Sequence, residues 1–64
     1  MYIVYGKRKD EKRFKPFDMK GNKFVVNLIH ATVFFDEQLE ELKKEVAFMN
    51  EHNPLYVFEI RKKG

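Results

Sequence analysis

The side chains best suited to chemistry are six cations that lie within nine residues near the N-terminus: Lys7, Arg8, Lys9, Lys12, Arg13 and Lys15. Tyr5, Phe14 and Phe17 flank them, so phosphates could meet cations while bases stack on aromatic rings. This pattern predicts a surface for DNA or RNA, with Phe17 as a candidate stacking residue. Asp10 and Glu11 interrupt the run, however, and such charge runs are usually solvated loops. A solubilising loop therefore stays open as the alternative.

The residue types needed for covalent catalysis are scarce. The chain has no Ser and no Cys, and Thr32 is its single Thr, so a Ser–His or Cys–His nucleophile pair cannot form. His30 falls in an apolar stretch and His52 at a predicted helix end, and both are interpreted as structural. The sequence also has no metal-ligand spacing and no phosphate-binding glycine loop. It predicts a non-enzymatic protein without a metal or cofactor.

Charge is divided unevenly along the chain, whose formal net charge is +3. Residues 1–23 carry eight Lys or Arg against three Asp or Glu, residues 24–53 carry two against six, and residues 54–64 carry three against one. A basic front and tail with an acidic middle give the molecule an electrostatic dipole. The absence of Cys, of a secretory signal and of an apolar run of about 18 residues predicts a cytoplasmic protein with no membrane partner.

The longest apolar run, Phe24–Phe35, predicts the central strand of the fold. It is rich in β-branched and aromatic residues and contains neither Gly nor Pro. Residues 20–23 directly before it predict a turn, because Gly21 and Asn22 can both take positive φ. The rest of the chain can then be placed around this strand.

Three further strands are predicted, two before the central run and one after the helix. Tyr2–Tyr5 forms the first, and Phe14–Met19 forms a weaker second one, which Pro16 makes either an edge strand or an irregular one. Leu55–Arg61 forms the last strand, and residues 62–64 are expected to fray. If the central and last strands share a sheet, the helix between them makes them parallel.

One helix is predicted between Asp36, a good N-cap, and Asn53, which precedes Pro54 and therefore avoids the α region. Apolar residues recur at helical spacing and form one stripe: Leu39, Leu42, Val46 and Met49. The fold class that follows is α+β, a small single domain spanning residues 1–64. Its order is β-β-β-α-β, with a three- to four-stranded, mostly antiparallel sheet and one helix on one face.

The predicted core joins the helix stripe to the covered face of the sheet. Its members are Ile3 or Val4, Val26, Leu28, Leu39, Leu42, Val46, Met49, Phe58 and Ile60. One helix covers only one sheet face, yet both faces of the predicted strands carry apolar residues. The second face is therefore expected to be an uncovered docking surface, a dimer interface or a stacking platform.

Several short stretches resemble known sequences: residues 2–8 (YIVYGKR) with 11–14 (EKRF), residues 27–34 (NLIHATVF), and residues 58–62 (FEIRK). Together they resemble a group of small uncharacterised accessory proteins of bacterial phages and conjugative elements. The resemblance implies a cytoplasmic mobile-element protein, and it carries over no functional residue.

The predicted function is a non-enzymatic binding module. Nucleic-acid binding through the basic N-terminal hairpin stands narrowly ahead. The alternative is a protein-interaction module of a mobile element, which binds a host protein or forms a homodimer through the uncovered sheet face. Such a role rests on analogy, because a fold does not by itself define a function.

Overall fold

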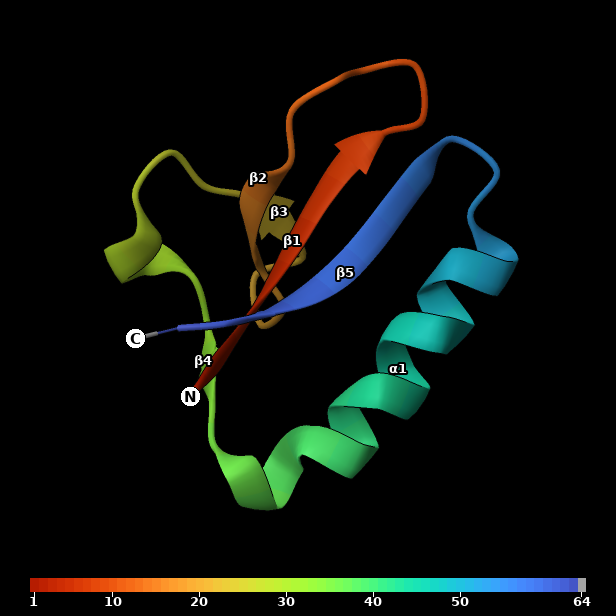
Figure 1. Cartoon of the computed structure of the whole chain (residues 1–64). Helices are drawn as coiled ribbons and strands as arrows, with labels where there is room; N and C mark the ends of the chain where they lie inside the picture. The colour runs from red at the N-terminus through yellow and green to blue at the C-terminus, as the bar shows by residue number, and fades with distance from the viewer. Residues whose placement is uncertain (64) are drawn as a thin grey trace.

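The computed structural model describes residues 1–63 and confirms the α+β class, with one helix and a curled antiparallel sheet (Figure 1). The strands are β1 (Tyr2–Arg8), β2 (Lys15–Asp18), β3 (Lys23–Phe24), β4 (Val33–Phe34) and β5 (Tyr56–Lys62). The helix is α1 (Leu39–His52), and two 3-10 turns are η1 (Leu28–His30) and η2 (Asp36–Gln38). Gly64 of the predicted fraying tail lies outside the described residues, while Lys62 belongs to β5.

β1 is the central strand of the sheet. It pairs antiparallel with β5 over its whole length, from Tyr2 opposite Lys62 to Arg8 opposite Tyr56. Its other edge is shared by β2 and β4, and β3 pairs with β2 at the far side of the sheet. Since β4 and β5 both run antiparallel to β1, they are parallel to each other as predicted, but β1 lies between them.

The prediction of one long central strand over Phe24–Phe35 is wrong. The run divides into β3, η1 and β4, so the sheet has five short strands instead of three to four. The Asn27 side chain accepts a hydrogen bond from the backbone N–H of Ile29 at 3.2 Å and so starts a 3-10 turn in mid-run. The central place in the sheet is held by β1, whose two edges are both paired.

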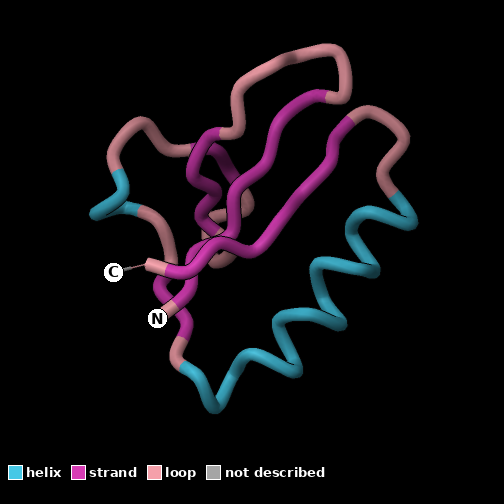
Figure 2. The backbone as a smooth tube through the Cα atoms, in the orientation of Figure 1, coloured by secondary structure: helices cyan, strands magenta, loops and turns pink. Residues whose placement is uncertain are grey.

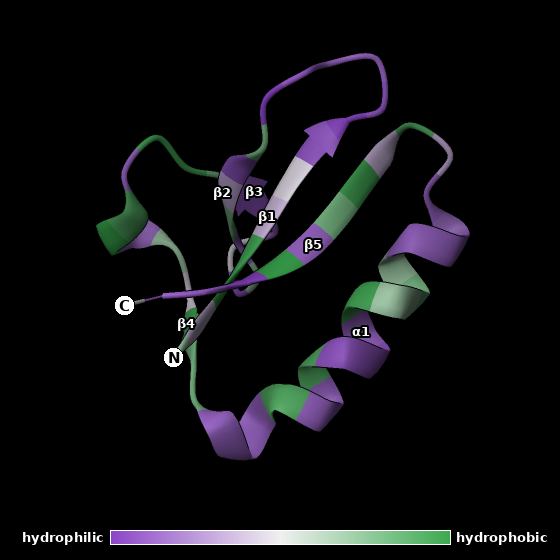
Figure 3. Ribbon diagram, in the orientation of Figure 1, coloured by the Kyte–Doolittle hydropathy of each residue, from purple (hydrophilic) through white to green (hydrophobic). Residues whose placement is uncertain are grey.

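The core lies between α1 and one face of the sheet. Leu42 and Val46 of α1 are buried against Val4, Phe17 and Phe58. Figure 3 shows hydrophobic residues of α1 on its side toward β5, which is the amphipathic pattern that the helix stripe predicts. Three other predicted core residues are only half-buried: Met49 and Ile60, which pack against this cluster, and Leu39.

Two predicted core residues are wrong, because Val26 and Leu28 lie on the surface with 104% and 39% of their area exposed. Phe17 and Ala31 are buried in addition to the predicted set. The helix also begins differently, since Asp36 opens η2 and caps no helix end with its side chain. The predicted helix end before Asn53 is confirmed.

The sheet curls, and an aromatic cluster fills the curl: Phe17, Phe24, Tyr56 and Phe58. Phe24 of β3 stacks on Phe58 of β5 with ring centroids 6.4 Å apart, although two strands lie between β3 and β5. Figure 2 shows this curvature in the backbone. Gly6 of β1 makes room for it, because a Cβ there would meet the Phe58 ring at 2.5 Å.

Two asparagines join the helix end to the outer edge of β5. The Asn50 amide donates to the carbonyl of Phe58 at 2.9 Å and accepts from its N–H at 2.7 Å. Asn53 accepts from the N–H of Tyr56 at 3.1 Å. These contacts satisfy backbone groups that an edge strand otherwise leaves open to another chain, and they fix α1 beside β5.

Candidate nucleic-acid interface

The basic hairpin loop, residues 9–14, joins β1 to β2 and projects from the sheet (Figure 1). Its two acidic residues are internal partners of the cations beside them. Asp10 pairs with Arg8 at 3.2 Å, and Glu11 pairs with Lys15 at 3.6 Å while also accepting from the Arg8 backbone N–H at 3.0 Å. The acids that interrupt the basic run therefore order the loop.

The structure separates five of the six predicted cations into two groups, and the sixth, Lys7, donates to the Glu11 carbonyl at 2.8 Å. Arg8 and Lys15 are held by carboxylates, and the hydrogen bond to Asp10 raises the pKa of the Arg8 guanidinium above its ordinary value. Lys9, Lys12 and Arg13 are exposed, and within residues 1–63 their side chains have no ion-pair partner. These three are the loop cations most available to a phosphate.

Phe17 cannot be the stacking residue that the sequence suggests. Only 5% of its area is exposed, and its ring packs edge-on against those of Phe24 and Phe58 at 5.1 and 5.0 Å. β2 turns this side chain into the core together with the covered face of β1. Phe17 is therefore a core residue and is not part of the candidate surface.

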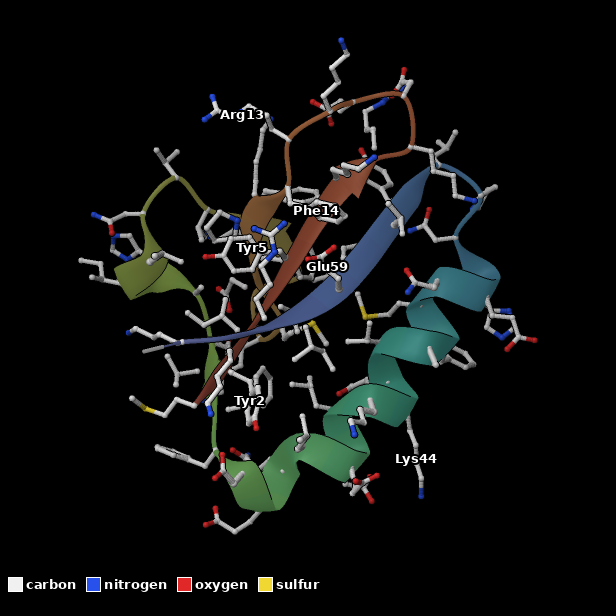
Figure 4. All side chains as sticks on the ribbon, in the orientation of Figure 1. Tyr2, Tyr5, Arg13, Phe14, Lys44 and Glu59 are labelled. Carbon is white, nitrogen blue, oxygen red and sulfur yellow. The ribbon has the colours of Figure 1, made fainter. Side chains whose placement is uncertain are left out.

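The helix-free face of the sheet holds a cluster that we call the aromatic–cationic platform: Tyr5, Lys7, Phe14 and Arg61. The Arg61 guanidinium carbon lies 4.5 Å from the Tyr5 ring centroid and 5.0 Å from that of Phe14. The Lys7 ammonium lies 5.4 Å from the Phe14 centroid. All three distances suit cation–π attraction. Figure 4 shows Tyr5 and Phe14 close together on the face that also carries Glu59, which pairs with Arg61 at 2.6 Å.

The β1–β5 register assembles this platform. Side chains alternate between faces along a strand, so Tyr5 and Lys7 point away from the core that Val4 enters. Arg61 lies opposite Ile3 and reaches the same face. Arg61 is a site residue that was not predicted from the sequence, and the signal that could have indicated it is the alternation of charged residues, Glu59 and Arg61, in the last strand.

The platform also revises the expectation of an open apolar sheet face. Ile3 is on this face, yet it is only 1% exposed. Charged groups accompany the rings, because Lys7, Glu59 and Arg61 all lie here. The helix-free face is therefore mixed and partly covered, and the exposed apolar surface of the molecule lies elsewhere.

One such surface is the projecting segment, which we define as Val25–His30 and in which three large apolar side chains are exposed within four residues. Val26, Leu28 and Ile29 in it expose 104%, 39% and 76% of their areas. Burying such a side chain would contribute about 1.5 to 3 kcal/mol, so this exposure is a sizeable unused driving force. Figure 3 shows the segment as a hydrophobic stretch at the periphery of the molecule.

The projecting segment is tied to the fold at both ends. The N–H of Val25 donates to the carbonyl of Pro16 in β2 at 3.0 Å. Beyond the Asn27-capped turn, the Thr32 hydroxyl donates to the Asp18 carboxylate at 2.8 Å. The segment is thus a braced loop. His30 belongs to it and is exposed, so its predicted place inside a strand is wrong.

Residues 1–63 contain neither a cluster of metal ligands nor a membrane-spanning helix. In this part of the chain no three His, Cys, Asp or Glu side chains gather closely enough to hold a metal ion. Across the same residues, no helix has the length and hydropathy needed to span a membrane. Comparison of the chain with protein-family models, curated sequences and solved structures finds no match. The resemblance to mobile-element proteins therefore stays a prediction from the sequence.

Proposed function

We propose that this protein binds single-stranded nucleic acid, DNA or RNA, and catalyses no reaction. The observation that carries the proposal is the aromatic–cationic platform, where two rings and two cations share the helix-free face beside the basic hairpin loop. Single-strand binders combine these same elements, rings for bases and a basic track for the backbone.

In this proposal the platform binds the bases and the loop binds the phosphates. Tyr5 and Phe14 stack on bases, and each stacked base contributes about 1 to 3 kcal/mol. Arg61 lies between the two rings in the free protein, so it moves aside or stacks on the base when a strand binds. The exposed cations Lys9, Lys12 and Arg13 meet phosphates along the loop.

Charge reversal tests the loop with a matched control. Lys9→Glu with Arg13→Glu changes the net charge as much as Lys43→Glu with Lys44→Glu on α1, where Lys44 points away from the sheet (Figure 4). The loop variant should weaken binding of a fluorescent single-stranded oligonucleotide and lower the salt slope by about 1.4, at about 0.7 per phosphate contact. The helix variant should change the slope little. If both variants lose the same affinity, the effect depends on net charge alone and not on the loop. If the wild type does not bind the oligonucleotide at low salt, the proposal is wrong.

A second candidate function is protein interaction, with a host protein or a second copy of the chain as partner. The observation that favours it is the projecting segment, because three apolar side chains are presented to solvent on a braced loop. A cytoplasmic role in a phage or conjugative element would fit either function, and its support is the sequence resemblance alone.

A further inference from the structure

A hollow lies between the projecting segment and the basic hairpin. It has a volume of about 460 Å³, and its floor is apolar: Phe14, Pro16, Phe24, Val25 and Val26. The other two lining residues are the cations Arg13 and Lys15, and the lining contains no carboxylate. An apolar floor with a cationic rim fits an apolar side chain that is flanked by negative charges.

The two cations at the rim of the hollow are not fully neutralised by neighbouring carboxylates. Among the described residues, Arg13 forms no ion pair, while the Lys15 ammonium lies 3.6 Å from the Glu11 carboxylate. A second hollow on the same segment, of about 550 Å³, adds Lys23 and His30. Its one acidic residue is Asp18, which already accepts the Thr32 hydroxyl. The field around the projecting segment is therefore predominantly positive.

The brace on the segment lowers the entropic loss that accompanies docking. Val26 and Ile29 are exposed, yet hydrogen bonds at Val25 and Thr32 hold the backbone on either side of them. A loop that is ordered before binding loses less conformational entropy than one that orders on contact.

We propose that this hollow docks an acidic peptide segment of a partner protein through one large apolar anchor residue. The anchor enters the hollow against Phe24 and Val26, and carboxylates on either side of it meet Arg13 and Lys15. This inference rests on the second candidate function, protein interaction. The hollow shares Arg13 and Phe14 with the proposed nucleic-acid surface, so Val26, which lines only the hollow, distinguishes the two proposals.

A random twelve-residue peptide library displayed on phage is the probe, selected against the immobilised full chain. We expect enriched peptides to be acidic and to carry Leu, Phe or Trp. A representative synthetic peptide should lose at least tenfold in affinity for Val26→Ser/Ile29→Ser and about fivefold for Arg13→Glu. Replacing its anchor with Ser should abolish binding.

Matched controls are residues that do not line the hollow. Leu55→Ser and Phe48→Ser remove apolar side chains that are 57% and 62% exposed, and Lys43→Glu reverses a cation on α1. Each should change the affinity less than twofold. Thermal melting of every variant verifies that the fold is kept.

Three results would overturn the inference in distinguishable ways. If enriched peptides bind the Val26, Ile29 and Arg13 variants as tightly as the wild type, the protein interacts with peptides but not through this hollow. Absence of both peptide enrichment and self-association would remove protein interaction and this hollow together. Self-association in sedimentation that Val26→Ser/Ile29→Ser abolishes, without peptide enrichment, would assign the segment to a second copy of the chain.

Discussion

The β1–β5 pair and the stretch from Phe24 to Phe34 are both rich in apolar and aromatic residues, yet the first forms long paired strands and the second does not. β1 and β5 pair along seven residues and bury Val4 and Phe58 under α1. The later stretch contributes only Phe24 to β3 and two residues to β4, and its middle projects from the molecule.

This difference is explained better by access to a strand edge for pairing than by hydrophobicity. β5 follows the helix and occupies one whole edge of β1. The other edge is divided between β2 and β4, so a long strand from residue 24 onward has no continuous edge to pair with. β-propensity is fulfilled only where cross-strand neighbours exist.

The largest expected effect sharpens this comparison. Leu42→Ala removes a side chain that is 2% exposed at the centre of the core, and it should lower the free energy of unfolding by about 2 to 5 kcal/mol. Val26→Ser, in the region that the sequence made central, should change stability by less than about 0.5 kcal/mol, as at other exposed sites. Urea melts of both variants measure the difference. Comparable losses would mean that the projecting segment is packed in solution.

Gly6→Ala should have the next largest effect. The new Cβ would meet the Phe58 ring at 2.5 Å and the Phe24 ring at 3.1 Å, so the aromatic cluster would have to shift. Overpacking of this kind costs about 1 to 3 kcal/mol. Thermal melting monitored by near-ultraviolet circular dichroism reports both stability and aromatic packing, and an unchanged spectrum and melting temperature would refute the close approach.

Asn50→Ala should cost less, toward the lower end of the roughly 1 to 3 kcal/mol that an unpaired buried polar group loses. It opens both the N–H and the carbonyl of Phe58 on the outer edge of β5, where water can reach part of the gap. Amide hydrogen exchange should accelerate at Phe58 in particular. Unchanged exchange there would show that the Asn50 contact contributes no protection.

The sequence predicted those features that local chemistry decides. Helical spacing located Leu42 and Val46, and Asn53 before Pro54 located the helix end. The turn expected at residues 20–23 formed one residue earlier, at residues 19–22, with Asn22 at φ 54°, because Lys23 already belongs to β3. The strand order, the burial of Phe17 and the meeting of Arg61 with Tyr5 and Phe14 depend on register between distant segments, which no local pattern contains.

The smallest expected effect concerns pH and the brace of the projecting segment. Hydrogen bonds from the Thr32 hydroxyl, and next from the Gly21 backbone, lower the pKa of Asp18 below its ordinary value of 3.8. The stability that ionised Asp18 contributes is therefore present above that value and is lost as pH falls through the lowered pKa. Thr32→Val should reduce the loss of urea resistance between neutral and acidic pH. An identical pH dependence in both proteins would contradict a role for this hydrogen bond.

The proposal of nucleic-acid binding is tested most directly by residue-resolved NMR during titration with a single-stranded oligonucleotide at low salt. We predict that the largest shift changes gather at Tyr5, Phe14 and Arg61, extend along the basic hairpin loop, and leave α1 unaffected. Saturable changes that centre on α1, or no changes at any position, would contradict it.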